Sequence, residues 1–297
     1  MDILQYWDVF MTAVLRGGLY SLMAVGLSLV FGVMNIANFA HGEFYMIGAY
    51  FAFFAFSVFG MSPIFSIITA GTLAFLVGAI MERSLFYPLR LRSKQNWLMN
   101  TFLLTLGISI ILQNGVKMLW GSTYRGIPAF WPGRLQLGAG GMEIAYDRIV
   151  GFFIAVIAIA ALVFFLNKTR VGRAIRAVSQ DETGAGLVGV DLKVIHTLTF
   201  ALSCLLAALA GACLLSITPA YPTMGVNPLY KSWFVLILVG MGNVGASIVG
   251  GLIVGILETI AYFQFGAGWQ DVISLVIIIL ILLFKPNGIF GKKGVKS

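Results

Sequence analysis

Hydrophobic residues fill long, nearly uninterrupted segments of this chain, separated by short polar stretches. The apolar segments are residues 9–33, 39–59, 64–81, 98–120, 149–166, 194–217, 229–241, 248–265 and 269–284. Most of them are long enough to cross the roughly 30 Å hydrocarbon layer of a bilayer, for which a helix of about 20 residues is needed. The pattern predicts an all-α, polytopic membrane helix bundle of about eight transmembrane helices, forming a single domain over residues 1–297.

Basic residues concentrate in three short stretches between or after these segments. The stretches contain Arg83, Arg90, Arg92 and Lys94; Lys168, Arg170, Arg173, Arg176 and Lys193; and Lys285, Lys292, Lys293 and Lys296. Short basic loops between membrane spans face the cytoplasm. The connection 121–148 then lies outside, and the stretch 229–284 crosses three times, its first crossing short or broken near the glycines at 240–247.

The side of the N-terminus stays open at the level of sequence. Three apolar segments before the first basic loop would leave Met1 outside, whereas Arg16 as an interfacial anchor favours Met1 inside. We therefore expect eight crossings, give or take one, and allow for one re-entrant segment.

Composition narrows the classes of function. Hydrophobic side chains make up 60% of the chain and charged ones 10%, far from the soluble range. The net charge of +8 resides in the loops just described, so it favours a membrane orientation over nucleic-acid binding. We expect the lipid bilayer, and no nucleic acid, as a partner.

The connection at residues 169–193 predicts two short amphipathic helices. Val171, Ile175 and Val178 recur at helical spacing in the first. Ser179 and Glu182 fit the S-x-x-E capping box, so the second helix is predicted to begin at residue 180 and to end near the glycine at 189. Two such helices either stabilise the bundle at the interface or form a lever for a soluble partner.

A polar cluster interrupts the apolar pattern early in the chain. Asn35, Asn38, His41 and Glu43 stand between two strongly apolar stretches, and the i, i+3 spacing of Asn38 and His41 places both on one helical face. These residues either line a solute path or form a hydrogen-bonded turn. Glu258, inside a later apolar run, marks either a path or a bundle contact.

Several catalytic signatures are missing from the sequence. No G-x-x-x-x-G-K-[ST] phosphate loop, G-x-S-x-G elbow or metal-ligand pattern occurs. We expect that the chain is not an enzyme and holds no metal or cofactor. A secondary transporter driven by an ion gradient would need intramembrane acidic residues, for which Glu43 and Glu258 are the candidates.

Four strings, in order and at the right spacing, closely resemble the permeases of Liv-type branched-chain amino acid ABC importers. They are NIANFAHGEFYMIGAY (35–50), GRAIRAVSQD (172–181), LTFALSCLLAALAGACL (198–214) and FKPNGIFGKK (284–293). The resemblance covers nearly the whole chain. It implies an inner (plasma) membrane subunit that works with a homologous second permease, two ATP-binding subunits carrying ATP and Mg, and a periplasmic substrate-binding protein.

The resemblance also assigns a role to the connection 169–193, as short cytoplasmic coupling helices that dock on the ATPases. The expected coupling residues are Arg173, Arg176, Gln180, Asp181, Glu182, Leu187, Val188 and Gly189. Thr183, Gly184 and Gly186 depart from the Ala-rich helix of the family, which puts the length of the second coupling helix in doubt. Branched-chain amino acids are the expected solutes, with other amino acids, urea, amides or small aromatic acids as alternatives.

Overall fold

The computed structural model describes residues 3–92, 96–137 and 142–291. Its elements are α1 (Ile3–Met34), α2 (His41–Ser57), α3 (Pro63–Met81), the π-helix η1 (Glu82–Phe86), α4 (Tyr87–Arg92), α5 (Trp97–Trp120), β1 (Arg134–Leu137), β2 (Met142–Ala145), α6 (Tyr146–Lys168), α7 (Arg170–Gln180), α8 (Glu182–Leu187), α9 (Leu192–Leu214), α10 (Val226–Val239), α11 (Val244–Phe265), the 3-10 helix η2 (Ala267–Trp269) and α12 (Gln270–Phe284). Lys94, Lys292, Lys293 and Lys296 lie outside the described residues.

The helices confirm the predicted all-α membrane bundle. Seven helical segments within the described residues are long and apolar enough to cross a membrane. Every predicted apolar segment corresponds to a helix, and α10 is shorter than α12 and α2, which have 15 and 17 residues. With 14 residues, α10 is about 21 Å long, less than the hydrocarbon thickness. This agrees with the expectation that the first crossing of residues 229–284 is short.

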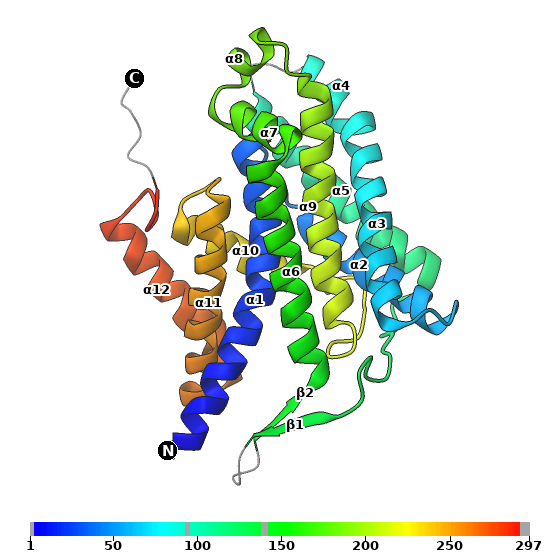
Figure 1. Cartoon of the computed structure of the whole chain (residues 1–297), viewed down its shortest axis with the longest axis vertical. Helices are drawn as coiled ribbons and strands as arrows, with labels where there is room; N and C mark the ends of the chain where they lie inside the picture. Colours follow the sequence, from blue (N-terminus) through cyan, green and yellow to red (C-terminus); the bar gives the residue numbers. More distant parts are fainter. Residues whose placement is uncertain (1–2, 93–95, 138–141, 292–297) are drawn as a thin grey trace.

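The two ends of the bundle differ in the segments they carry. In Figure 1, α4, α7 and α8 lie at one end, and the start of α1 and the hairpin β1–β2 lie at the other. Residues Pro286, Asn287 and Phe290 line a cleft together with residues of α7, so the segment after α12 is also near the α7 end. The described parts of the three basic stretches therefore share one end. If that end is cytoplasmic, α1 begins outside.

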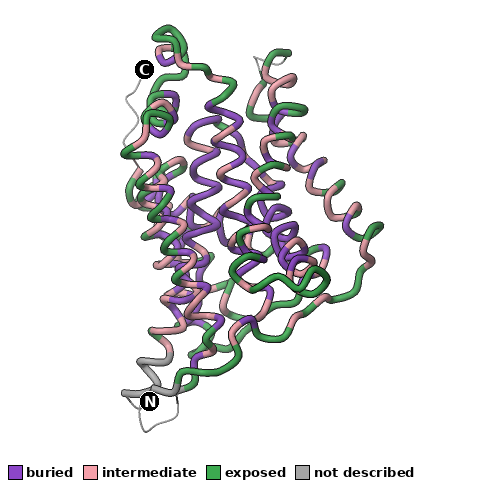
Figure 2. The backbone as a smooth tube through the Cα atoms, turned by 45° about the vertical axis from the view of Figure 1, so that its right-hand side comes forward, coloured by how far each residue is buried: buried purple, intermediate pink, exposed green. Residues whose placement is uncertain are grey.

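The core is formed by closely packed helices from distant parts of the sequence. Figure 2 shows the buried residues concentrated in the centre of the bundle. A Cβ atom at Gly48 of α2 would lie 2.3 Å from the Ala208 carbonyl oxygen of α9, and one at Gly251 of α11 would lie 2.3 Å from Ser21 Oγ of α1. Small residues that let helix backbones approach this closely are typical of membrane helix packing.

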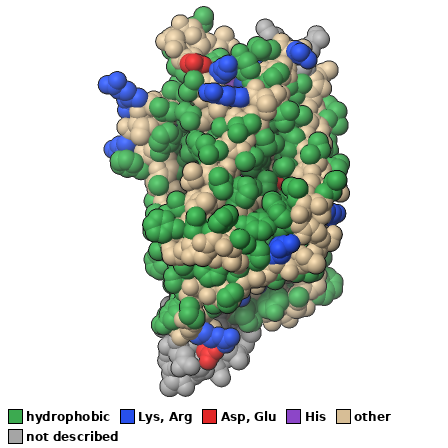
Figure 3. All heavy atoms as spheres, turned by 90° about the vertical axis from the view of Figure 1, so that its right-hand side faces the viewer, with side chains coloured by type: hydrophobic (Ala, Val, Ile, Leu, Met, Phe, Trp, Pro, Cys, Tyr) green, Lys and Arg blue, Asp and Glu red, His purple; other side chains and the backbone are tan. Residues whose placement is uncertain are grey.

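The outer surface is apolar around the middle of the bundle. Figure 3 shows hydrophobic side chains covering most of the visible face. Large exposed hydrophobic side chains occur along α3, α5 and α12, among them Leu76, Ile111 and Leu283. In water such a surface would drive aggregation, whereas in a bilayer it contacts acyl chains.

Local sequence signals explain several helix ends. Ser62 precedes Pro63 at the first position of α3, and the Asp191 carboxylate accepts a hydrogen bond from the Val194 amide at the start of α9. Gly240 has a φ of 100°, in the left-handed region, where it ends α10 before the tight turn into α11.

Candidate functional site

The connection between α1 and α2 is a non-helical break at residues 35–40. Asn35 ends α1 with a φ of 55°, a left-handed conformation that Asn tolerates better than most residues. The Asn38 side-chain oxygen accepts a hydrogen bond from the Ala40 amide at 3.0 Å, which shapes the turn just before α2. Within the described part of the chain, the buried Nδ2 of Asn38 has no hydrogen-bond partner.

The predicted helical face shared by Asn38 and His41 is wrong. Asn38 precedes α2 and His41 is its first residue, so the two side chains are not one turn apart on a helix. The physical reason is the local bond from the Ala40 amide to Asn38, because Asn side chains compete with helical hydrogen bonding in this way.

His41 joins three helices. The imidazole is fully buried and donates from Nε2 to the Met23 carbonyl oxygen of α1 at 3.0 Å. This assigns the proton to Nε2, so Nδ1 accepts from the Ser203 hydroxyl of α9 at 3.3 Å. Both ring nitrogens are therefore used in holding α1, α2 and α9 together.

Glu43 connects α2 to α5. Its carboxylate is buried, and Oε1 accepts hydrogen bonds from Ser109 Oγ at 2.8 Å and from Gln113 Nε2 at 2.7 Å. Oε2 has no partner among the described residues. Sequence reasoning missed Ser109 and Gln113, although their i, i+4 spacing within an apolar segment is a signal for one polar helical face. The result is a polar contact where α5 meets the bundle.

Aromatic side chains flank this break. The ring of Phe39 stacks on Trp233 of α10 with centroids 5.2 Å apart and meets Phe102 of α5 edge-on at 5.0 Å. The indole nitrogen of Trp233 is a buried donor without a partner among the described residues. The break and the helices beside it thus combine apolar surface with three buried polar atoms that have no partner among the described residues, on Asn38, Glu43 and Trp233.

Glu258 lies in a second, separate cluster between α10, α11 and α12. The buried Lys231 ammonium donates to both the Glu258 and the Asp271 carboxylates. Glu258 Oε2 also accepts from Tyr20 Oη at 2.8 Å and from Gln270 Nε2 at 3.1 Å. The structure does not place Glu258 with the polar residues of the break, and its role in a solute path stays a prediction. The missed signal was Lys231, a lone charge within an apolar helix.

The connection 169–193 forms the two predicted short helices, but the predicted cap is wrong. Helix α7 extends through Gln180, and Ser179 donates its hydroxyl hydrogen bond back to the Arg176 carbonyl oxygen. Asp181 instead caps α8, where its Oδ1 accepts from the Gly184 amide at 3.0 Å. Asp is as strong a cap as Ser, and α7 continues because Ile175 and Val178 are buried.

The surface of α7 and α8 is polar along one side and apolar at its tip. Arg173, Arg176, Gln180, Asp181, Glu182 and Gly189 are all exposed. Leu187 and Val188 are 84% and 81% exposed, so the apolar tip contacts almost nothing in this chain. Gly189 follows with a φ of 91°, in agreement with the predicted end of this helix. The six residues of α8 reflect the glycines that the sequence places in it.

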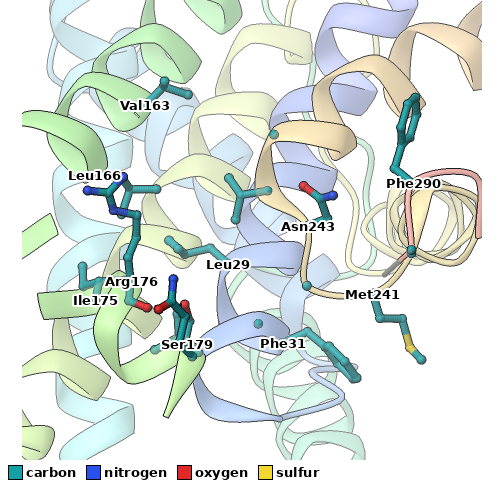
Figure 4. A pocket seen from close by; sticks show the side chains of 18 of the residues that line it. Leu29, Phe31, Val163, Leu166, Ile175, Arg176, Ser179, Met241, Asn243 and Phe290 are labelled. Atoms are coloured by element: carbon teal, nitrogen blue, oxygen red, sulfur yellow. The ribbon is translucent and has the colours of Figure 1, made fainter. Parts of the chain in front are cut away.

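A cleft of about 840 Å³ opens beside α7. Figure 4 shows Arg176 and Ser179 on one side, and Asn243, Met241 and Phe290 on the other. The floor between them is formed by residues near the end of α1, including Leu29. Of the predicted coupling residues, Arg176 and Gln180 line this cleft, which separates the α6–α7 side of the bundle from the α10–α11 turn.

Comparison with known proteins places this arrangement in a family. The family model for the branched-chain amino acid transport system permease component matches residues 9–282. BraD of Pseudomonas aeruginosa, a high-affinity branched-chain amino acid transport system permease protein, is 32% identical over 100% of this chain and 99% of its own length. LivH of Escherichia coli K12, with the same description, is 31% identical with the same coverage. A probable branched-chain amino acid transport permease protein LivH of Methanocaldococcus jannaschii is 29% identical over 94% of this chain and 90% of its own length.

No solved structure matches the chain. The family match and the sequence relatives extend over nearly all of it, as do the membrane helices described above. The chain therefore belongs to the family of permease components of branched-chain amino acid transport systems.

Proposed function

We propose that this chain forms part of the inner-membrane passage of an ABC importer for branched-chain amino acids. It works with a homologous second permease, two ATP-binding subunits that carry ATP and Mg, and a periplasmic substrate-binding protein. The observation that carries the proposal is the full-length similarity to BraD and LivH permeases, together with the exposed helices α7 and α8 at the basic end of the bundle.

Helix α8 supplies the docking element for an ATP-binding subunit. Leu187 and Val188 project at its tip with more than four-fifths of their surface exposed. Burying one such side chain in a partner's apolar groove contributes about 1.5–3 kcal/mol. Arg173 and Arg176 on α7 add positive charge next to this tip, which favours an acidic rim around the groove.

The break between α1 and α2 supplies the solute contacts. A zwitterionic amino acid needs an acceptor for its ammonium group, donors for its carboxylate and an apolar surface for its side chain. Glu43 Oε2 is an unpaired acceptor, and Asn38 Nδ2 and Trp233 Nε1 are unpaired donors, all within the described residues. Phe39, stacked on Trp233, adds apolar surface. Because these groups are buried, a change of conformation has to open the break during transport.

Reconstitution tests the proposed function. The permease pair, the ATP-binding subunits and the binding protein are placed in proteoliposomes, and uptake of radiolabelled leucine, isoleucine and valine is measured with ATP. Competition by unlabelled urea, acetamide and benzoate tests the alternative solutes. We expect ATP-dependent uptake of leucine that the other branched-chain amino acids inhibit. Strong inhibition of leucine uptake by urea, acetamide or benzoate, without inhibition by isoleucine and valine, would refute the solute assignment.

A substitution at the α8 tip tests the docking role. Leu187→Asp should abolish substrate-stimulated ATP hydrolysis, because it places an unpaired charge in an apolar groove. Thr183→Asp adds the same charge elsewhere on the exposed side of α8 and is the matched control. Normal ATPase binding and stimulation in the Leu187→Asp complex would show that α8 is not the docking element.

A further inference from the structure

A buried carboxylate, Glu82, lies at the end of α3 in the π-helical turn η1. Both of its oxygens are held: Oε1 pairs with Arg90 Nη1 at 3.3 Å, and Oε2 accepts from Thr197 Oγ1 of α9 at 2.7 Å. A buried ion pair is weak evidence for stability, since desolvation offsets much of the attraction. Single π turns within helices are frequent at functional sites. The contacts of Glu82 on its two sides indicate its role in transport.

On one side, contacts lead from Glu82 to the docking helix. Thr197 is adjacent to His196, which is buried in α9. His196 Nε2 lies 3.6 Å from the Glu182 carboxylate, and Glu182 is the first residue of α8. This contact is longer than a hydrogen bond, and neither ring nitrogen of His196 has a partner among the described residues, so α8 acts on the turn of α9 that holds Glu82 by steric contact.

On the other side, contacts lead from Glu82 to the break between α1 and α2. The Arg90 guanidinium lies over the Trp97 ring of α5, 5.1 Å from its centroid. Trp97 Nε1 donates to the carbonyl oxygen of Met34 at 2.9 Å. Met34 is the last residue of α1, and Asn35, with its left-handed backbone, opens the break.

We infer that a chain of contacts forms a relay that transmits motion of α8 to the α1–α2 break. The relay runs through Glu182, His196 and Thr197, Glu82, Arg90, Trp97 and Met34. Glu82, Arg90 and Trp97 are positioning residues in it. Glu82 is fully buried, and Arg90 and Trp97 are partly buried. The inference rests on the proposed function, because it assigns a transmission route between the docking helix and the solute contacts.

An ion pair, a ring contact and one directed hydrogen bond suit this role. Each depends on distance and orientation, so a shift or rotation of α9 by one or two ångströms breaks one of them rather than deforming it smoothly. The end of α1 is suited to respond to this motion. Its last carbonyl is held by Trp97, and the next residue has a backbone conformation that is uncommon outside glycine.

The test uses the complete importer in proteoliposomes and measures leucine uptake, ATP hydrolysis and co-purification of the ATP-binding subunits. Glu82→Gln removes the charge in the middle of the relay. Trp97→Phe keeps an aromatic ring under Arg90 but removes the donor to Met34, and it is mild enough to preserve folding. Arg83→Gln is the matched control, because Arg83 lies in the same π turn with its side chain exposed.

We expect both relay variants to bind the ATP-binding subunits and to keep basal hydrolysis. Leucine transported per ATP hydrolysed should fall roughly 2- to 30-fold, the range seen for residues that couple distant sites. The double variant should be no worse than the worse single variant, because both changes interrupt one route. Arg83→Gln should behave like the unmodified protein.

Three results would overturn the relay: unchanged coupling in both variants, effects that simply add in the double variant, or loss of ATPase binding in Glu82→Gln. The last would make Glu82 part of the docking surface. Failure of the proposed function is separate, since it shows as absence of leucine uptake by the unmodified complex.

Discussion

Replacing Lys231 by Met should destabilise the bundle strongly. The ammonium is 3% exposed and bridges Glu258, which is completely buried, and Asp271, which is 55% exposed. Removing one partner of a buried ion pair typically costs about 3–5 kcal/mol, because it leaves the other charge buried and uncompensated. The charge left behind here is the Glu258 carboxylate.

The structure sets the expected magnitude within that range. Glu258 keeps two neutral donors, Tyr20 and Gln270, so we expect a loss near the lower end, about 3 kcal/mol. Asp271 regains water when its partner is removed, and Asp271→Asn should cost less than about 1 kcal/mol. In the double variant Lys231→Met with Glu258→Gln no buried charge remains. The Gln oxygen still accepts from Tyr20, so most of the loss should be recovered.

Reversible unfolding of the purified subunit in detergent, titrated with a denaturing surfactant, gives the free energies of the variants. The expected order of stability is Asp271→Asn above the double variant, and the double variant above Lys231→Met. If Lys231→Met were no less stable than Asp271→Asn, or if the double variant were less stable than the single one, the buried-charge explanation would be refuted.

Three further outcomes follow from packing, chemistry and orientation. Gly48→Ala should lower the free energy of unfolding by about 1–3 kcal/mol, because its new methyl group meets the Ala208 backbone. Gly107→Ala, which has open space around the new methyl group, should leave it unchanged. Equal unfolding midpoints of the two variants would contradict this. Asn38→Leu should reduce leucine uptake while ATPase binding persists, and normal uptake would favour a purely structural turn. Cysteine at position 180, on a background without native cysteines, should react with an impermeant reagent only in opened cells, and labelling of intact cells would reverse the orientation.

The sequence predicted the membrane helices well because each one is defined by its own hydrophobicity. The prediction included the short α10. The cap of α8 was misplaced because Ser179 and Asp181 are both good caps. The choice between them depends on how far α7 continues while packing Ile175 and Val178 against the bundle.

The polar contacts were largely invisible in the sequence because their partners come from distant helices. Glu43 was recognised as a candidate, but its donors Ser109 and Gln113 are 66 and 70 residues away. Glu82 lies 115 residues from Thr197. Hydrophobic periodicity predicts that a helix exists and carries no information on which helix it packs against, so such pairs emerge only from the tertiary structure.

The π-helical turn at Glu82–Phe86 has a consequence for rotational phase. A π turn holds one more residue than an α turn, so everything after it is rotated by about 100° relative to a regular helix of the same sequence. The direction in which Arg90 points thus depends on the number of residues between it and α3 as well as on its identity. Deleting one residue of the π turn would restore a regular helix in which Arg90 keeps its direction, whereas a regular turn formed without a deletion would rotate α4 by about 100° away from α5. When relatives are aligned, a one-residue gap at this turn therefore marks a regular helix in which the direction of α4 is retained.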